Sequence, residues 1–136
     1  MRTKTILFLS TPLLIIFMII IYSNSLLCSE DRIRANLLRH TPIGTDMDDA
    51  IKFIKNNKNW EIDHISNESG YTLRWGRPEE PSPDDIALGR TIGKQSIRIT
   101  IGEYKIIFIT SVVVFWGFDE NSKLIDLHVR KDVDAL

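Results

Sequence analysis

Close to its start, the chain carries an apolar segment that water accommodates poorly. The segment runs from Ile6 to Tyr22 as ILFLSTPLLIIFMIIIY, seventeen residues without a charge, and it follows the basic residues Arg2 and Lys4. This length reaches the lower end of what a membrane-spanning helix needs. It also exceeds the apolar core of a usual signal peptide. We therefore predict that Ile6 to Tyr22 form a helix that contacts the membrane.

The residues around this segment predict its orientation and its processing. Because a short basic flank stays in the cytoplasm, the rest of the chain is expected outside, as a single-pass protein of the cell membrane. The alternative is cleavage near Ser25, where Ser23-Asn24-Ser25 follows the small-x-small rule and would release a secreted domain. Lipidation of Cys28 is disfavoured, because Leu27 stands where a bacterial lipobox has a small residue. Residues 1–28 are thus predicted as a signal anchor or a signal peptide.

Composition limits what the remainder of the chain can be. The chain has 136 residues, which suits one domain. Without Arg2 and Lys4, 15 basic residues face 18 acidic ones, a net charge of −3. That balance argues against a nucleic-acid partner, which would require a basic face. Since Cys28 is the single cysteine, no disulfide can form within the chain.

Two helices are expected before the first strand. Ile33, Leu37 and Leu38 form a narrow apolar stripe between charges, and Pro42 ends that helix at the residue before it. We read residues 29–41 as a stalk helix.

The second helix has the clearer pattern. Thr45 is the predicted N-cap. The positive end of the helix dipole would stabilise the three acidic side chains that follow it. One face of this helix repeats apolar residues at helical spacing, namely Met47, Ala50, Ile51 and Ile54.

Strand patterns follow the helices. Trp60–Ser66 alternates loosely, and Tyr71, Leu73 and Trp75 alternate with polar residues. Gly76–Gly93 contains three prolines and two acidic pairs, so it is expected to be a long exposed loop. Ile97, Ile99 and Ile101 predict the next strand. Gly102-Glu103 predicts a turn, and Tyr104–Ile109 should continue in extended form.

The last third of the chain predicts a hairpin. Val112–Phe118 is apolar on both faces, which is typical of a central strand. Asp119–Ser122 predicts a turn, and Ile125, Leu127 and Val129 alternate with polar residues on the following strand. The tail Lys131–Leu136 is expected to fray. Residues 42–136 are thus predicted as a small α+β extracytoplasmic domain, with one or two helices packed on an antiparallel sheet of about four to five strands.

The order of these elements and the run from Phe118 to Asp126 resemble small exported bacterial domains of the BamE (SmpA/OmlA) and β-lactamase-inhibitor-protein type. In those domains a Gly-Met/Thr-x-x-acidic helix start precedes the sheet, and a hairpin with the motif Phe-Asp-x-x-Gly-Lys closes it. Here Ser122 stands at the glycine of the motif, so Asn121 is expected to take the turn position. The likeness extends over roughly residues 42–130, and the chain is also similar to uncharacterised small membrane-anchored proteins of low-GC bacteria. The resemblance implies an α+β architecture and an envelope setting, and it assigns no catalytic residue.

Candidate chemical sites each have a simpler explanation. Asp46, Asp48 and Asp49 lack the alternating ligands and the distant glutamate of a calcium loop, and helix-dipole stabilisation explains them. His40, His64 and His128 are too far apart in the sequence for a usual zinc site, so no metal site is predicted. We expect a partly buried His64 and a solvated His128.

The sequence also lacks catalytic and cofactor motifs. Asp126 and His128 share a strand face and could orient a nucleophile, yet no serine lies in a nucleophile-elbow sequence. The Gly93-Lys94 pair lacks the spacing of a phosphate loop, so no cofactor is predicted.

Trp75 is the aromatic residue most suited to binding. It ends a predicted strand beside Arg74 and Arg77 at the start of the long loop, and aromatic-plus-arginine sets anchor binding surfaces. We therefore expect a membrane-tethered, non-enzymatic interaction domain whose partner is an envelope protein, bound through this loop or an open sheet edge. The alternatives are a small-molecule or peptide sensor or an inhibitor-type module, and then a hydrolase.

Overall fold

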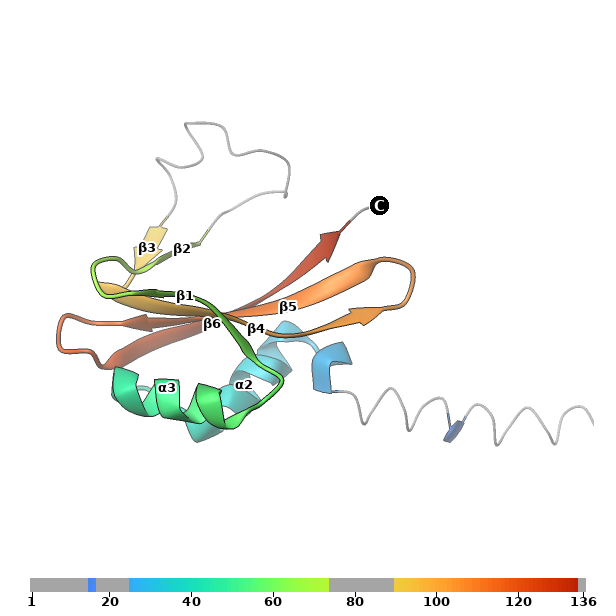
Figure 1. Cartoon of the computed structure of the whole chain (residues 1–136), viewed down its shortest axis with the longest axis horizontal. Coiled ribbons are helices and arrows are strands. Elements are labelled where there is room, and N and C mark those ends of the chain that lie inside the picture. Colours follow the sequence, from blue (N-terminus) through green and yellow to red (C-terminus); the bar gives the residue numbers. More distant parts are fainter. Residues whose placement is uncertain (1–14, 17–24, 74–89, 135–136) are drawn as a thin grey trace, which may run out of the picture.

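The computed structural model describes residues 15–16, 25–73 and 90–134. Two helices lie against one face of an antiparallel sheet, which confirms the predicted α+β class (Figure 1). The predicted membrane segment lies outside the described residues except for Ile15 and Ile16. Among the described residues, no helix is long and apolar enough to span a membrane.

The elements follow one another simply along the chain. A 3-10 turn, η1 (Ser25–Leu27), precedes the helices α2 (Glu30–His40) and α3 (Met47–Asn56). The main sheet has the order β1-β4-β5-β6, and a separate two-stranded ribbon joins β2 to β3. The strands are β1 (Glu61–Ser66), β2 (Tyr71–Leu73), β3 (Arg90–Ile92), β4 (Gln95–Lys105), β5 (Ile109–Phe118) and β6 (Leu124–Asp134).

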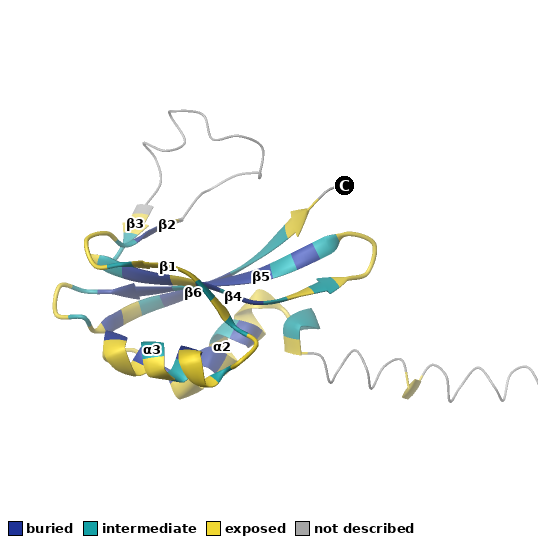
Figure 2. Ribbon diagram, viewed as in Figure 1, coloured by how far each residue is buried: buried dark blue, intermediate teal, exposed yellow. Residues whose placement is uncertain are grey.

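The core lies between the helices and the sheet (Figure 2). The predicted stripe of α3 is confirmed, because Met47, Ala50 and Ile54 are buried there. The segment predicted as a stalk also contributes to this core, through Ile33 and Leu37 of α2. From the sheet, the core takes alternate residues of three neighbouring strands: Ile97, Ile99, Val112, Val114, Trp116, Leu127 and Val129.

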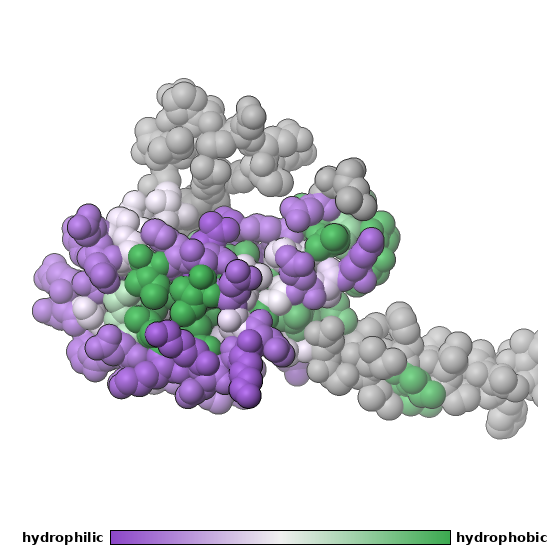
Figure 3. All heavy atoms as spheres, viewed as in Figure 1, coloured by the Kyte–Doolittle hydropathy of each residue, from purple (hydrophilic) through white to green (hydrophobic). Residues whose placement is uncertain are grey.

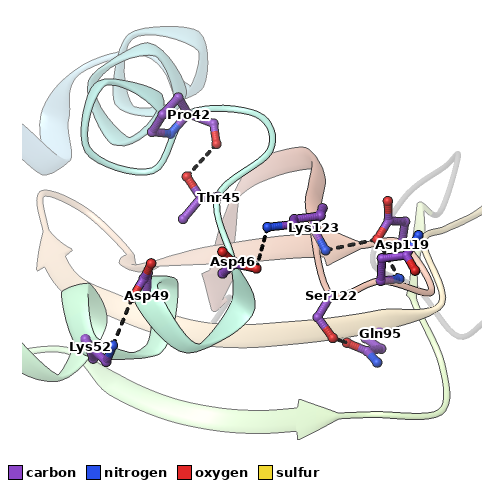
Figure 4. Close-up of polar contacts among 10 residues, drawn as sticks. Pro42, Thr45, Asp46, Asp49, Lys52, Gln95, Asp119, Ser122 and Lys123 are labelled. Atoms are coloured by element: carbon purple, nitrogen blue, oxygen red, sulfur yellow. Dashed lines mark hydrogen bonds and ion pairs between the residues drawn. The ribbon is translucent and has the colours of Figure 1, made fainter.

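The start of α3 differs from the prediction. Asp46, not Thr45, occupies the N-cap position and makes no side-chain capping bond, while the Thr45 hydroxyl donates to the Pro42 carbonyl at 2.6 Å (Figure 4). The turn between β5 and β6 takes the place of the side-chain cap, because the N–H of Met47 donates to the Ser122 carbonyl at 2.9 Å. A partner distant in the sequence thus satisfies a helix N–H that a side chain usually satisfies.

The turn between β5 and β6 was predicted at the correct position, but the residue expected to adopt the left-handed conformation was wrong. Ser122 itself has φ 59°, in the left-handed region, where Asn121 was expected to compensate for the missing glycine. The Asp119 carboxylate accepts bonds from the N–H groups of Asn121 and Lys123 at 2.8 and 2.9 Å, and the Ser122 hydroxyl lies 2.8 Å from Gln95 Oε1. These bonds hold a serine in a conformation that favours glycine.

The predicted turn at Gly102-Glu103 was wrong. Both residues lie inside β4, and the chain reverses at Ile106–Phe108 instead. Gly102 serves close packing, since a Cβ atom there would lie 2.8 Å from Leu26 Cδ1. A glycine that admits a neighbouring side chain thus looked like a turn residue in the sequence.

Strand β6 corrects two further expectations. It stays paired with β5 as far as Asp134, so the described part of the predicted fraying tail is sheet. A register shift opposite Gly117 and Phe118 leaves Ile125 exposed, although Leu127 and Val129 are buried as predicted. An extra residue at such a bulge loses its place in the alternation.

A buried hydrogen bond joins the end of α2 to the central strand. The indole N–H of Trp116 donates to the Thr41 hydroxyl at 3.1 Å, and that hydroxyl donates to the Leu37 carbonyl at 3.1 Å. Trp116 and Thr41 are 0% and 1% exposed, so water cannot replace either partner.

We predict that Thr41→Val lowers the free energy of unfolding by about 1–3 kcal/mol, because the buried indole N–H loses its acceptor. Thr45→Val removes an exposed hydroxyl bond and should cost about 0.5 kcal/mol. Urea denaturation of the full chain in detergent, followed by tryptophan fluorescence, measures both values. Equal losses in the two variants would contradict the role of the buried bond.

Candidate functional site

The sheet face away from the helices carries a cluster that we call the aromatic–arginine face. It consists of Tyr71, Arg98, Phe115, His128 and Arg130. Phe115 of β5 is central, because Arg98 of β4 and His128 of β6 are its direct cross-strand partners. The guanidinium carbons of Arg98 and Arg130 lie 5.8 and 5.3 Å from the centre of the Phe115 ring. Both distances are within the range of cation–π attraction.

Tyr71 brings the small ribbon of β2 and β3 onto this face. Its ring centre lies 5.5 Å from that of Phe115 and 6.3 Å from that of His128. Gly117 makes this approach possible, since a Cβ atom there would lie 2.8 Å from Tyr71 Cε1. The three rings therefore form one layer over β5 and β6.

A carboxylate fixes the tyrosine in place. The Tyr71 hydroxyl donates to Asp126 Oδ2 at 2.7 Å, and Arg34 of α2 donates to Asp126 Oδ1 at 3.0 Å. Burial alone would raise the pKa of Asp126, but the hydrogen bonds from Tyr71, Arg34 and the Leu127 N–H outweigh it and hold that pKa below its usual value. Burial, reinforced by the Asp126 carboxylate, raises the pKa of Tyr71, which therefore stays a hydrogen-bond donor.

The arginines of the face are paired with acidic neighbours. Arg98 Nε lies 3.5 Å from Asp63, and Arg130 approaches both oxygens of Asp132, at 2.6 and 2.7 Å. The side chains of Arg98 and Arg130 are 48% and 40% exposed, so both remain partly accessible to solvent, although the Arg130 Nε atom itself is buried. Partly exposed ion pairs contribute little stability.

His128 was expected to be solvated, but it is half-buried within the ring layer. Burial, together with the positive charges of Arg130 and Arg34, lowers its pKa. The ring is therefore neutral near pH 7 and adds aromatic surface rather than charge. The Asp126 carboxylate, which shares this strand face with His128, accepts side-chain hydrogen bonds from Tyr71 and Arg34.

The residues proposed from the sequence as binding anchors, Arg74, Trp75 and Arg77, lie outside the described residues. Cys28 is half-buried, and its carbonyl accepts a bond from Lys131 Nζ at 2.7 Å. His64 was predicted to be partly buried but is exposed, because a register shift in β1 between Ile62 and His64 breaks the alternation.

The acidic start of α3 is held by lysines. Asp46 lies 2.7 Å from Lys123 Nζ and Asp49 lies 2.9 Å from Lys52 Nζ, in the arrangement of Figure 4. A cavity of about 200 Å³ beside this helix start is lined by Asp46, Asp48, Asn67 and Gln95. Within the described ranges, no group of three or more histidine, cysteine or acidic residues could hold a metal ion.

Sequence reasoning missed the aromatic–arginine face. Arg98 and Arg130 occupy the polar phase of two predicted strands, so each looked unremarkable when its strand was considered alone. Only Phe115 could have been identified from the sequence, because it is an aromatic residue on the second face of a strand predicted to be covered on both sides.

No protein-family model matches this chain, and neither the curated proteins nor the solved structures match it significantly. A function is therefore inferred from the chemistry of the chain's own surfaces.

We predict that Tyr71→Phe raises the pKa of Asp126, because one of the hydrogen bonds that stabilise its charged form disappears. A carboxyl whose folded pKa is depressed stabilises the fold above its unfolded pKa and loses that contribution as pH falls through the folded value. Carbon NMR titration of the Asp126 carboxyl measures the shift. Thr72→Ser, beside Tyr71 on the same strand, is the control and should leave the titration unchanged.

His128 generates a separate pH dependence. Because its pKa is lowered in the folded protein, the unfolded chain binds this proton more readily, so stability falls as pH drops below about 6.5. His128→Phe keeps the ring and removes that loss, so its free energy of unfolding should decline less between pH 7 and pH 5. A His128→Phe variant whose free energy of unfolding declines as steeply as that of the native chain would refute the assignment.

Proposed function

We propose that this protein is a membrane-tethered, non-enzymatic interaction domain of a bacterial envelope, and that it binds a protein partner through the aromatic–arginine face. The observation that carries the proposal is that the guanidinium groups of Arg98 and Arg130 both lie over the Phe115 ring. They do so on the face of the sheet opposite the core, and the helices cover only the core face (Figure 1). Phenylalanine, tyrosine and arginine are enriched where protein partners bind.

The tether supports an extracytoplasmic setting. The uncharged segment Ile6 to Tyr22 with its basic flank is suited to a single-pass anchor whose domain lies outside the cytoplasm. Cleavage near Ser25 is the alternative and would give a secreted form of the same domain. The resemblance to BamE-type domains favours the same envelope setting.

The open sheet edges are less suited to binding than the face. At the β6 edge, Arg34 Nε donates to the Leu127 carbonyl at 2.6 Å, and the Glu30 carboxylate accepts from the Lys131 N–H at 2.9 Å. Side chains of α2 thus occupy the groups that another strand would need. The β1 edge carries a bulge and two exposed acidic residues, Glu61 and Asp63, which discourage strand addition.

The chain also leads from this face into the residues proposed as binding anchors. Arg74, Trp75 and Arg77 follow directly after β2, whose Tyr71 packs on Phe115. Two aromatic-plus-arginine sets thus adjoin in the sequence. A partner that presents acidic and aromatic side chains is the best chemical match.

The proposal is tested by recovering the partner from native membranes after mild crosslinking. We expect Phe115→Ala to reduce co-purification by about 30-fold, the effect of a hot spot of roughly 2 kcal/mol. Phe53→Ala is the matched control, because Phe53 is equally half-buried but lies on α3, across the sheet, and should retain the partner. Circular dichroism of both variants verifies folding. Undiminished recovery by folded Phe115→Ala would refute the proposal.

A further inference from the structure

The β4–β5 turn is unusually apolar for an exposed chain reversal. Its three residues, Ile106, Ile107 and Phe108, are 74%, 74% and 48% exposed. Val133 of β6, which lies beside this end of β5, is 54% exposed. Figure 3 shows hydrophobic residues gathered at this end of the sheet. Turns in water normally consist of glycine, proline, asparagine, aspartate or serine, none of which occurs at these three positions.

The chain enters the domain at the same end. η1 and the β4–β5 turn lie at one end of the sheet in Figure 1. Two contacts hold the entry there: Leu26 packs on Gly102 of β4, and Lys131 Nζ of β6 bonds to the Cys28 carbonyl at 2.7 Å. Gly102 precedes Ile106 by four residues, which is about 13 Å along a strand.

The chain length then limits how far this end can lie from a bilayer. The uncharged segment ends at Tyr22, and η1 begins at Ser25. Three residues span at most about 10 Å. A bilayer that holds the segment Ile6 to Tyr22 therefore lies within reach of the apolar turn.

Charges near the turn are balanced. On the strands near the turn, three basic residues, Lys105, Arg130 and Lys131, are matched in number by three acidic ones, Glu103, Asp132 and Asp134, so an anionic surface gains no net attraction. Tyr104, with Lys131 Nζ 5.3 Å from its ring centre, is a half-buried aromatic of the kind that favours the membrane interface. The apolar side chains, rather than charge, would provide the attraction to lipid.

We infer that Ile106, Ile107 and Phe108 insert into the surface of the membrane that anchors this chain. The inference rests on the proposed membrane tether. Insertion provides a second attachment beside the anchor, which fixes the orientation of the domain and of its aromatic–arginine face relative to the lipid.

Spin labels on the full chain test this insertion. Cys28→Ser removes the single cysteine, and Ile107→Cys places a nitroxide on the turn of the chain reconstituted in phosphatidylcholine vesicles. Ile125→Cys is the matched control, since Ile125 is 44% exposed and lies at the opposite end of β5 and β6. We expect the ratio of collisions with oxygen to collisions with a water-soluble nickel chelate to be several-fold higher at position 107 than at 125.

Flotation of the same vesicles separates this inference from the tether. If the chain floats with lipid but both labels are equally accessible to nickel, insertion is refuted while the tether stands. If the chain does not float, both are refuted. A label at 107 that is shielded from oxygen and nickel alike and is broadened by a neighbouring label would show that a second copy covers the turn, which also refutes insertion.

Discussion

Burial of β5 on both faces is the constraint on which the rest of the structure depends. Val112, Val114 and Trp116 face the helices, while Val113 and Phe115 lie on the other side. A central strand with two apolar faces needs a covering layer on each. Two helices supply the first layer, and side chains of β2, β4 and β6 supply the second. This division explains why the second side keeps exposed arginines and can serve as a binding surface.

Asp126 links these layers through side chains that are distant in the sequence. It accepts bonds from Arg34 of α2 and from Tyr71 of β2, so one carboxylate connects the helices, the sheet edge and the ribbon. The Arg34–Asp126 pair is partly exposed, with side chains 41% and 33% accessible, so its Coulomb energy is modest. Its main effect is geometric, because it directs the Tyr71 ring onto Phe115.

The two surfaces of functional interest differ in chemistry and in place. The aromatic–arginine face combines rings with paired charges, as in surfaces that bind proteins. The β4–β5 turn is apolar and lies at the end where the chain enters the domain, as a membrane contact requires. Under the two proposals, a domain held to lipid at one end would present this face at a constant angle to a protein partner.

Periodicity in the sequence was sufficient for the second helix, for the central strand Val112–Phe118 and for the α+β class, because these depend on residues close together in the chain. It was insufficient for Gly102, whose missing side chain accommodates Leu26, and for Ser122, whose conformation depends on bonds to Asp119 and Gln95. Periodicity was also insufficient for the aromatic–arginine face, because that face depends on the contact between Tyr71 and Asp126, which are 55 residues apart. Local patterns specify which side of an element is apolar, whereas the pairing of distant elements places side chains next to each other, and the chemistry of this protein lies in those pairings.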